Sequence, residues 1–299
     1  VNMIYVYLLS ILIARVVQAI FSKMSSNKAG NIAVTVRYTA YQYTLSAVLG
    51  LVLVLGSLSG LKIDLPTAAI ALLSGASLFF STFFGIYGMK SGTVSLVSMF
   101  STAGLLVPVA AGVFLFDQPV SLLQGVGTAV FFVSAWLLIK NSENTYNGFS
   151  LKTFLLLIGA MLSNGLTMLA QQMYTHYVPN GSISLFSLLS FGIAAAAGYP
   201  AALILGRRQA ETDGGEKVKL GKTLYICGAA LAAAVFVINQ FATELTALLP
   251  PVFLFTFING GGTVISTLVA AAMYKEKLSV YSILGVIIGI GAMVIIKLC

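Results

Sequence analysis

The stretch YLLSILIARVVQAIFSK, residues 7–23, decides the class of fold to which this chain belongs. Apart from Arg15 and Gln18 near its middle, the stretch is mainly apolar. With the apolar residues before it, it reaches the roughly 20 residues that a helix needs to cross a bilayer. No basic segment precedes it and no small-residue cleavage site follows it, as a signal peptide would require. We therefore expect a retained membrane-spanning helix over residues 3–22.

Apolar runs of similar length recur along nearly the whole chain. Of the 299 residues, 59% are hydrophobic and 8% are charged, and the mean hydropathy is +0.99, whereas a soluble domain carries about 25% charged residues. A surface so poor in charge must face lipid. The sequence predicts an all-α, multi-pass integral membrane protein of a prokaryotic cell membrane, with ten transmembrane helices over residues 3–22, 33–57, 66–88, 92–116, 120–139, 153–172, 183–205, 223–243, 249–273 and 280–297.

The net charge of +8 does not indicate a nucleic-acid partner, because the cations are spread over short loops and span ends. The expected partners are the lipid bilayer and a small-molecule substrate. Cys227 and Cys299 give no disulfide framework, and His176 is the single histidine. We therefore expect no metal and no cofactor, and the sequence is compatible with a monomer.

The chain repeats itself about a hydrophilic stretch at its midpoint, residues 140–152. The segment QPVSLLQGVG (118–127) aligns with EKLSVYSILG (276–285). The sequence thus predicts two repeats of five helices, residues 1–142 and 143–299. An odd number of spans in each repeat forces the two into opposite orientations, as in many secondary transporters.

Polar residues occupy matching places in the two repeats. The alignment above sets Ser81-Thr82 on Asn239-Gln240 and Ser101 on Asn259. A second alignment pairs two triplets that each have the i, i+3, i+7 spacing of one helix face. The triplets are Arg15, Gln18, Ser22 and Asn164, Thr167, Gln171.

The segment AAMYKEKLSVYSILGVIIGIGAMVIIK (271–297) resembles the end-of-half signature of the drug/metabolite transporter superfamily, in particular of its ten-helix proteins with tandem EamA-type domains. The resemblance covers both halves and implies two inverted five-helix repeats around a central cavity, alternating access, and small organic solutes as substrates. Gln118 replaces a glutamate that the family often has after its fourth helix. The positions that carry the resemblance are Glu276, Leu278, Ser279, Gly285, Lys90 and Arg37.

Arg15 is the first candidate for substrate binding. An ionisable group within a span is costly and is a functional candidate by default, and Gln18 lies on the same helix face. The alternative is a helix-packing arginine bonded to backbone carbonyls or polar neighbours. Arg37 is a weaker candidate, because about four residues into its span a long side chain can reach the membrane interface.

Amides and hydroxyls at matching positions are further candidates, although such groups also hold helices together. Asn259 runs directly into Gly260–Gly262, and for these glycines we predict close helix packing. The full set of predicted substrate-binding residues is Arg15, Gln18, Arg37, Ser81, Asn164, Asn239, Gln240 and Asn259.

The positions of the acidic residues limit the classes of function that the sequence supports. Each of the 8 acidic residues lies in a predicted loop or at a span end, and Glu244 is nearest to a span interior. We expect a secondary-type transporter of small organic metabolites, amino acids or related carboxylates, working by alternating access. The alternatives are a cation or drug efflux carrier, which should need a deep acid, and a non-transport membrane scaffold. One histidine and no acid deep in a span leave little for catalysis, so we do not expect an enzyme.

Two arguments about membrane orientation conflict. Most lysines and arginines fall in the loops after the odd-numbered spans, including residues 206–222, and the positive-inside rule places those loops in the cytoplasm. The family resemblance implies the reverse, with both termini cytoplasmic. Because charge bias acts during insertion of this particular chain, we predict the charge-based orientation.

Overall fold

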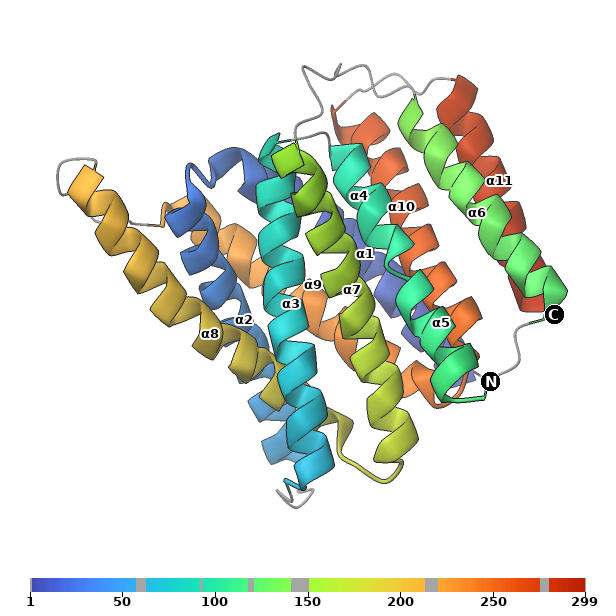
Figure 1. Cartoon of the computed structure of the whole chain (residues 1–299), viewed down its shortest axis with the longest axis horizontal. Coiled ribbons are helices and arrows are strands. Elements are labelled where there is room, and N and C mark those ends of the chain that lie inside the picture. The colour runs from blue at the N-terminus through green and yellow to red at the C-terminus, as the bar shows by residue number, and fades with distance from the viewer. Residues whose placement is uncertain are drawn as a thin grey trace.

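The computed structural model describes residues 2–57, 63–91, 94–117, 121–140, 151–212, 220–274 and 280–298. All regular secondary structure within these residues is helical (Figure 1). The eleven helices are α1 (Asn2–Lys28), α2 (Ile32–Ser57), α3 (Leu65–Ser91), α4 (Val94–Ala103), α5 (Leu106–Leu115), α6 (Leu122–Lys140), α7 (Leu151–Tyr177), α8 (Ile183–Thr212), α9 (Lys222–Thr246), α10 (Pro251–Tyr274) and α11 (Val280–Leu298).

Six of the described helices, α1, α2, α3, α7, α8 and α9, are long and apolar enough to cross a membrane. Shorter apolar segments lie in α4–α5, α6 and α11. Large apolar side chains such as Leu55, Leu203 and Ile226 are exposed on the outside of the bundle, as expected where lipid replaces water. The chain is therefore an all-helical, membrane-embedded protein.

Helices from the two ends of the sequence are interleaved. α2 packs against α8, α6 against α11, α1 against α9 and α10, and α7 against α3, α4 and α5. In Figure 1 the pair α6 and α11 stands at one side of the bundle and α8 at the other, with α3 and α7 between them. Both termini lie at the same end, which we call the terminal end.

The fourth predicted span, residues 92–116, is a broken helix. Pro108 has no N–H to donate to the carbonyl of Gly104, which instead accepts from Val107 N at 3.0 Å. The N–H of Leu105 bonds to Thr102 O at 3.0 Å, so Ser101 O loses its usual partner four residues on. The prediction of one continuous helix over these residues is therefore corrected to two helices, α4 and α5, joined at Gly104 and Leu105.

Several helices extend beyond the predicted boundaries. α1 and α7 run to Lys28 and Tyr177, and α8 continues through Arg207 and Arg208 to Thr212, so part of the loop predicted over residues 206–222 is helical. Of the positions that carry the family resemblance, Glu276, Leu278 and Ser279 lie outside the described residues, as does Gln118.

Asp64 begins α3 with a side-chain cap, because its Oδ1 accepts the Thr67 N–H at 2.9 Å. Hydrogen bonds from Thr67 hold the pKa of Asp64 below its ordinary value. The cap is thus a carboxylate at neutral pH, which suits the positive end of the helix dipole.

Four helices pack through apolar side chains at the end of the bundle opposite the termini. Tyr38, Ile86 and Leu224 belong to one buried cluster, which joins the C-terminal parts of α1 and α3 to the N-terminal parts of α2 and α9. The hydroxyl groups of Ser25 and Tyr38 lie 2.6 Å apart within it. Apolar side chains therefore fill the space among α1, α2, α3 and α9 at that end.

Candidate functional site

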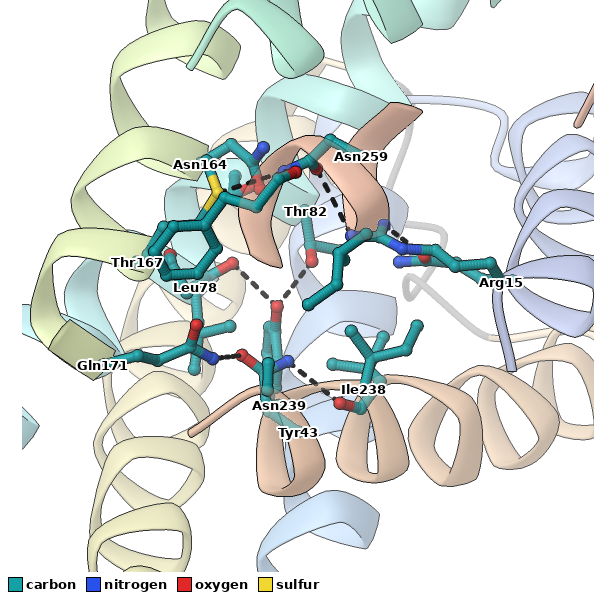
Figure 2. A pocket seen from close by; sticks show the side chains of 17 residues that line it. Arg15, Tyr43, Leu78, Thr82, Asn164, Thr167, Gln171, Ile238, Asn239 and Asn259 are labelled. Carbon is teal, nitrogen blue, oxygen red and sulfur yellow. Dashed lines mark hydrogen bonds between the residues drawn. The ribbon is translucent and has the colours of Figure 1, made fainter. Parts of the chain in front are cut away.

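A small cavity of about 70 Å³ lies among α1, α2, α3, α7, α9 and α10 (Figure 2). Some of the side chains that line it are apolar and others carry amide or hydroxyl groups. Arg15 is the charged residue of the lining. The lining residues whose polar groups or contacts matter below are Arg15, Gln18, Tyr43, Ser81, Thr82, Asn164, Thr167, Met168, Gln171, Ala242, Asn239, Phe255 and Asn259.

Arg15 enters the cavity from the middle of α1 and bonds only to amides among the described residues. Its Nη1 donates to Gln18 Oε1 at 2.8 Å, and its Nη2 donates to Asn259 Oδ1 at 3.3 Å. Its Nε is buried and has no hydrogen-bond partner. A guanidinium has five N–H donors. This one has no carboxylate partner among the described residues, and at least its Nε–H donor is unused.

Asn259 is held in the orientation that Arg15 needs. Its Nδ2 donates to Phe255 O at 3.0 Å, one turn back on α10, and lies 3.1 Å from the sulfur of Met168 on α7. These contacts turn Oδ1 toward Arg15 (Figure 2). Asn259 therefore links α10 to both α1 and α7.

Three successive glycines let α10 approach its neighbours closely. A Cβ on Gly262 would lie 3.2 Å from Arg15 Cδ, and one on Gly261 would lie 3.0 Å from Leu12 Cδ2. A Cβ on Gly260 would lie only 2.5 Å from the ring of Phe131 on α6. The prediction of close packing at Gly260–Gly262 is confirmed, and the stem of Arg15 lies against this seam.

A second amide pair joins α7 and α9 across the cavity. Gln171 Nε2 donates to Asn239 Oδ1 at 2.9 Å, and Asn239 Nδ2 donates to Val235 O at 2.9 Å. Beside this pair, the Tyr43 hydroxyl donates to Leu78 O at 2.7 Å and contacts the hydroxyl of Thr82 (Figure 2). The wall is thus fixed by hydrogen bonds between its own groups.

Asn164 bonds to the broken helix. Its Nδ2 donates to Ser101 O at 2.7 Å, the carbonyl that the break between α4 and α5 leaves without its usual helical partner. Next to it the backbone of α7 closely approaches the junction between α4 and α5, since a Cβ on Gly165 would lie 2.6 Å from Gly104 O. Asn164 therefore lines the cavity and also satisfies a backbone group.

The structure brings most of the predicted site residues together. Six of the eight line the cavity: Arg15, Gln18, Ser81, Asn164, Asn239 and Asn259. Gln240 does not, because successive helical residues point about 100° apart. Its Oε1 instead accepts from Ser187 on α8 at 2.8 Å.

Arg37 also lies away from the cavity and is exposed. The face of α2 that it shares with Tyr41 and Thr44 points away from the cavity, and Thr44 contacts the hydroxyl of Tyr199 at 3.0 Å. The residue of α2 that lines the cavity is Tyr43. The predicted helix was right, but the predicted face of it was not the one that lines the cavity.

Sequence analysis left several lining residues out of the predicted set. Thr167 and Gln171 share the helix face of Asn164, so their spacing was a usable signal, and Thr82 adjoins Ser81 at a repeated position. Tyr43 was weighed only as one of several aromatic residues that could stack on a ligand, and Met168 gave no signal. An aromatic residue or a methionine in a span is most often a packing residue.

A second, larger pocket of about 400 Å³ opens at the terminal end. It is bounded by Pro108, Val109 and Gly112 of α5, by Gln124 of α6, and by residues 246–252 between α9 and α10. Thr246 and Val252 lie one helical turn beyond Ala242 and Phe255, which line the central cavity. We call this second pocket the vestibule, because successive turns of the same two helices line both spaces.

Comparisons with known proteins bear on the fold alone. No family model matches the sequence, and no curated protein matches it. A crystal structure described only as that of a protein is similar in fold, with a TM-score of 0.75, 12% sequence identity, and coverage of 99% of this chain and 97% of that chain. The same arrangement of helices therefore occurs in a solved structure over nearly its full length.

Proposed function

We propose that this protein is a secondary-type transporter that moves small organic solutes, amino acids or related carboxylates, across a prokaryotic cell membrane. The observation that carries the proposal is Arg15: a cation held among neutral groups in a central cavity, with unmatched N–H donors. A carboxylate is the ligand whose two oxygens fit such a guanidinium.

The proposal includes ten spans in two inverted repeats, with α4 and α5 together forming one span. The packing supports this, since α1 contacts α9 and α10 as α7 contacts α3 and α4–α5. The bond from Arg15 to Asn259 and the bond from Asn164 to Ser101 join positions that the sequence alignments pair. Matching contacts of this kind are expected of repeats related by a pseudo-two-fold axis.

The difference between the two ends supports alternating access. The apolar cluster that contains Tyr38 and Leu224 fills the space among α1, α2, α3 and α9 at one end, whereas the vestibule approaches the cavity from the terminal end. In this conformation a solute would enter from the terminal end. Transport requires a second conformation in which the two ends exchange roles.

The lining argues against the competing functions. A cation or drug exporter would offer its substrate a carboxylate, whereas the charged side chain lining this cavity is Arg15. A non-transport scaffold would have no use for a cation and amides gathered at the centre of the bundle, at the desolvation cost that such groups carry. Solute transport accounts for both the position and the chemistry of these side chains.

Uptake into proteoliposomes tests the proposal directly. Purified protein is reconstituted and screened with radiolabelled amino acids, organic acids and amines. Arg15→Gln should reduce uptake of the best substrate about tenfold or more, the equivalent of one charge-assisted hydrogen bond.

The matched control for this experiment is Arg37→Gln, which removes an exposed arginine outside the cavity and should leave uptake near the wild-type level. Equal yields of monodisperse protein from the membrane show that both variants fold. If no member of the panel is taken up, or if Arg15→Gln transports normally, the proposal fails.

A further inference from the structure

The hydrogen bonds in the cavity wall leave a free donor beside Arg15 and free acceptors on α7. The side-chain oxygens of Gln18, Asn239 and Asn259 each accept a bond from another wall residue. The amide N–H₂ of Gln18 makes no hydrogen bond to the described residues, and Arg15 Nε is unpartnered. The side-chain oxygens of Asn164 and Gln171 accept no hydrogen bond from the described residues. A carboxylate placed at Arg15 therefore meets the free N–H₂ of Gln18 and the one positive charge, whereas the free acceptors on α7 are neutral.

The described acidic residues all lie outside the lining of the cavity. Asp64 and Asp117 are exposed at helix ends, and Glu211 ends α8 far from the cavity. Glu244 is on α9, five residues from Asn239 and about 140° around the helix from it. Within the described part of the chain, the charge facing the solute is therefore the single positive charge of Arg15.

From these two observations we infer that the solute is a net monoanion, a monocarboxylate without an ammonium group. This inference rests on the proposed function and narrows its substrate class. A single carboxylate neutralises Arg15 and accepts from the free donors. The ammonium of an amino acid would be desolvated with no carboxylate to pair with, and a dicarboxylate would leave its second charge unmatched. Unpaired charges inside a membrane protein are costly.

Three-carbon acids are suitable probes for a cavity of this size. L-Lactate, L-alanine and malonate have similar volumes and carry net charges of −1, 0 and −2 at neutral pH. Each is titrated against purified protein by thermal shift and then tested as a competitor of lactate uptake in proteoliposomes, with protein-free liposomes as the background. A six-carbon set, 2-hydroxyisocaproate and leucine, repeats the comparison with a larger side chain.

The hydroxy acids should bind at concentrations about tenfold or more below those of the matching amino acids and of malonate. Binding of alanine or leucine as tight as that of the hydroxy acids overturns the inference but leaves the carrier intact. Binding of malonate as tight as that of lactate also overturns it. If no compound in either set binds, the inference and the proposed function fail together.

An isosteric substitution tests the charge itself. Gln18→Glu keeps the oxygen that accepts from Arg15 Nη1, but it places a carboxylate beside the guanidinium. If Arg15 serves the solute, lactate binding should fall about tenfold or more, because the cation is already neutralised. If Arg15 only holds helices together, the new ion pair should leave binding unchanged.

The matched control is Gln240→Glu. It makes the same change one residue from Asn239, where Ser187 can still donate to the new carboxylate, outside the cavity lining. Lactate binding should stay within twofold of wild type in this variant. Equal losses in the two variants would overturn the inference, since the effect would then not depend on the position of the charge.

Discussion

At Gly260 the lack of a side chain lets α10 pack closely against α6. An alanine there would place its Cβ 2.5 Å from the ring of Phe131, which is 1% exposed and belongs to a buried cluster with Phe255. Gly291 on α11 has nothing within 4 Å of the same hypothetical atom. The two positions therefore separate close packing from the general effect of glycine in a helix.

We predict that Gly260→Ala lowers the stability of the protein by about 1–3 kcal/mol, the usual cost of overpacking. Gly291→Ala should be neutral or stabilising by up to about 1 kcal/mol, because alanine favours the helix. Thermal unfolding in detergent measures both. Equal melting temperatures for the two variants would contradict the close packing of α10 against α6.

Asn164 carries a second prediction at this scale. Asn164→Leu keeps the branching and the number of side-chain heavy atoms. It leaves Ser101 O with the Gly104 N–H at 3.2 Å but without its side-chain donor, at a cost of about 1–2 kcal/mol within a membrane bundle. Thr167→Val is the control on the same helix face, since Thr167 bonds only to Ser163 O of its own helix. A loss confined to Asn164→Leu in thermal unfolding supports the role; equal small losses would refute it.

Which residues face the cavity was only partly predictable. The i, i+3, i+7 spacing correctly placed Arg15, Gln18 and Asn164 at the cavity, because an α-helix presents positions with this spacing on one side. Arg37 and Gln240 were placed in the site by analogy of position, which does not fix rotation about the helix axis. A single residue step turns a side chain by about 100°, enough to move it out of the cavity.

At the scale of helices, the apolar runs predicted where nearly every helix lies. A helix that crosses a bilayer needs about 20 mainly apolar residues, and such a run is easily recognised in the sequence. They did not predict the break between α4 and α5. Pro108 lies inside an otherwise apolar run, and proline occurs in membrane helices without always breaking them. At the break, Gly165 and Asn164 of α7 meet the freed backbone, and such a contact is invisible in one segment alone.

Pro108→Ala tests the cause of the break. The variant regains an N–H that can donate to Gly104 O, so α4 and α5 should join into one helix. Amide hydrogen exchange over residues 104–109 should slow about tenfold, as expected for one added hydrogen bond of about 1 kcal/mol or slightly more. Exchange in α7 serves as an internal reference. Unchanged exchange at residues 104–109 would show that α7, and not Pro108, holds the break open.

For the whole molecule, the position of the cations predicts an orientation. The ends of α1, α6 and α8 that carry Lys23, Lys28, Lys140, Arg207 and Arg208 all lie opposite the terminal end. In a background without Cys227 and Cys299, we predict that Asn147→Cys and Gly214→Cys resist an impermeant thiol reagent on intact cells and react after lysis. Labelling of both from outside would place the termini in the cytoplasm, as the family resemblance implies.

Glu244 bears on energy coupling. Because it lies on the face of α9 turned away from Asn239, we predict that Glu244→Gln changes initial uptake rates less than twofold and that the protein equilibrates its solute without a proton requirement. Proteoliposomes with and without an imposed pH gradient measure this. Accumulation above equilibrium that needs the pH gradient and disappears in Glu244→Gln would show that the carboxyl group moves protons.

The bond between Arg15 and Asn259 spans 244 positions of the chain, and this separation sets a delay during synthesis. At about 5–20 residues per second, the ribosome needs tens of seconds to make α10 after α1 has entered the membrane. During that time Gln18, three residues away on the same helix, is the nearest group able to share the charge of Arg15. The nascent α1 therefore stays without the amide of Asn259 until the last fifth of the protein is being made.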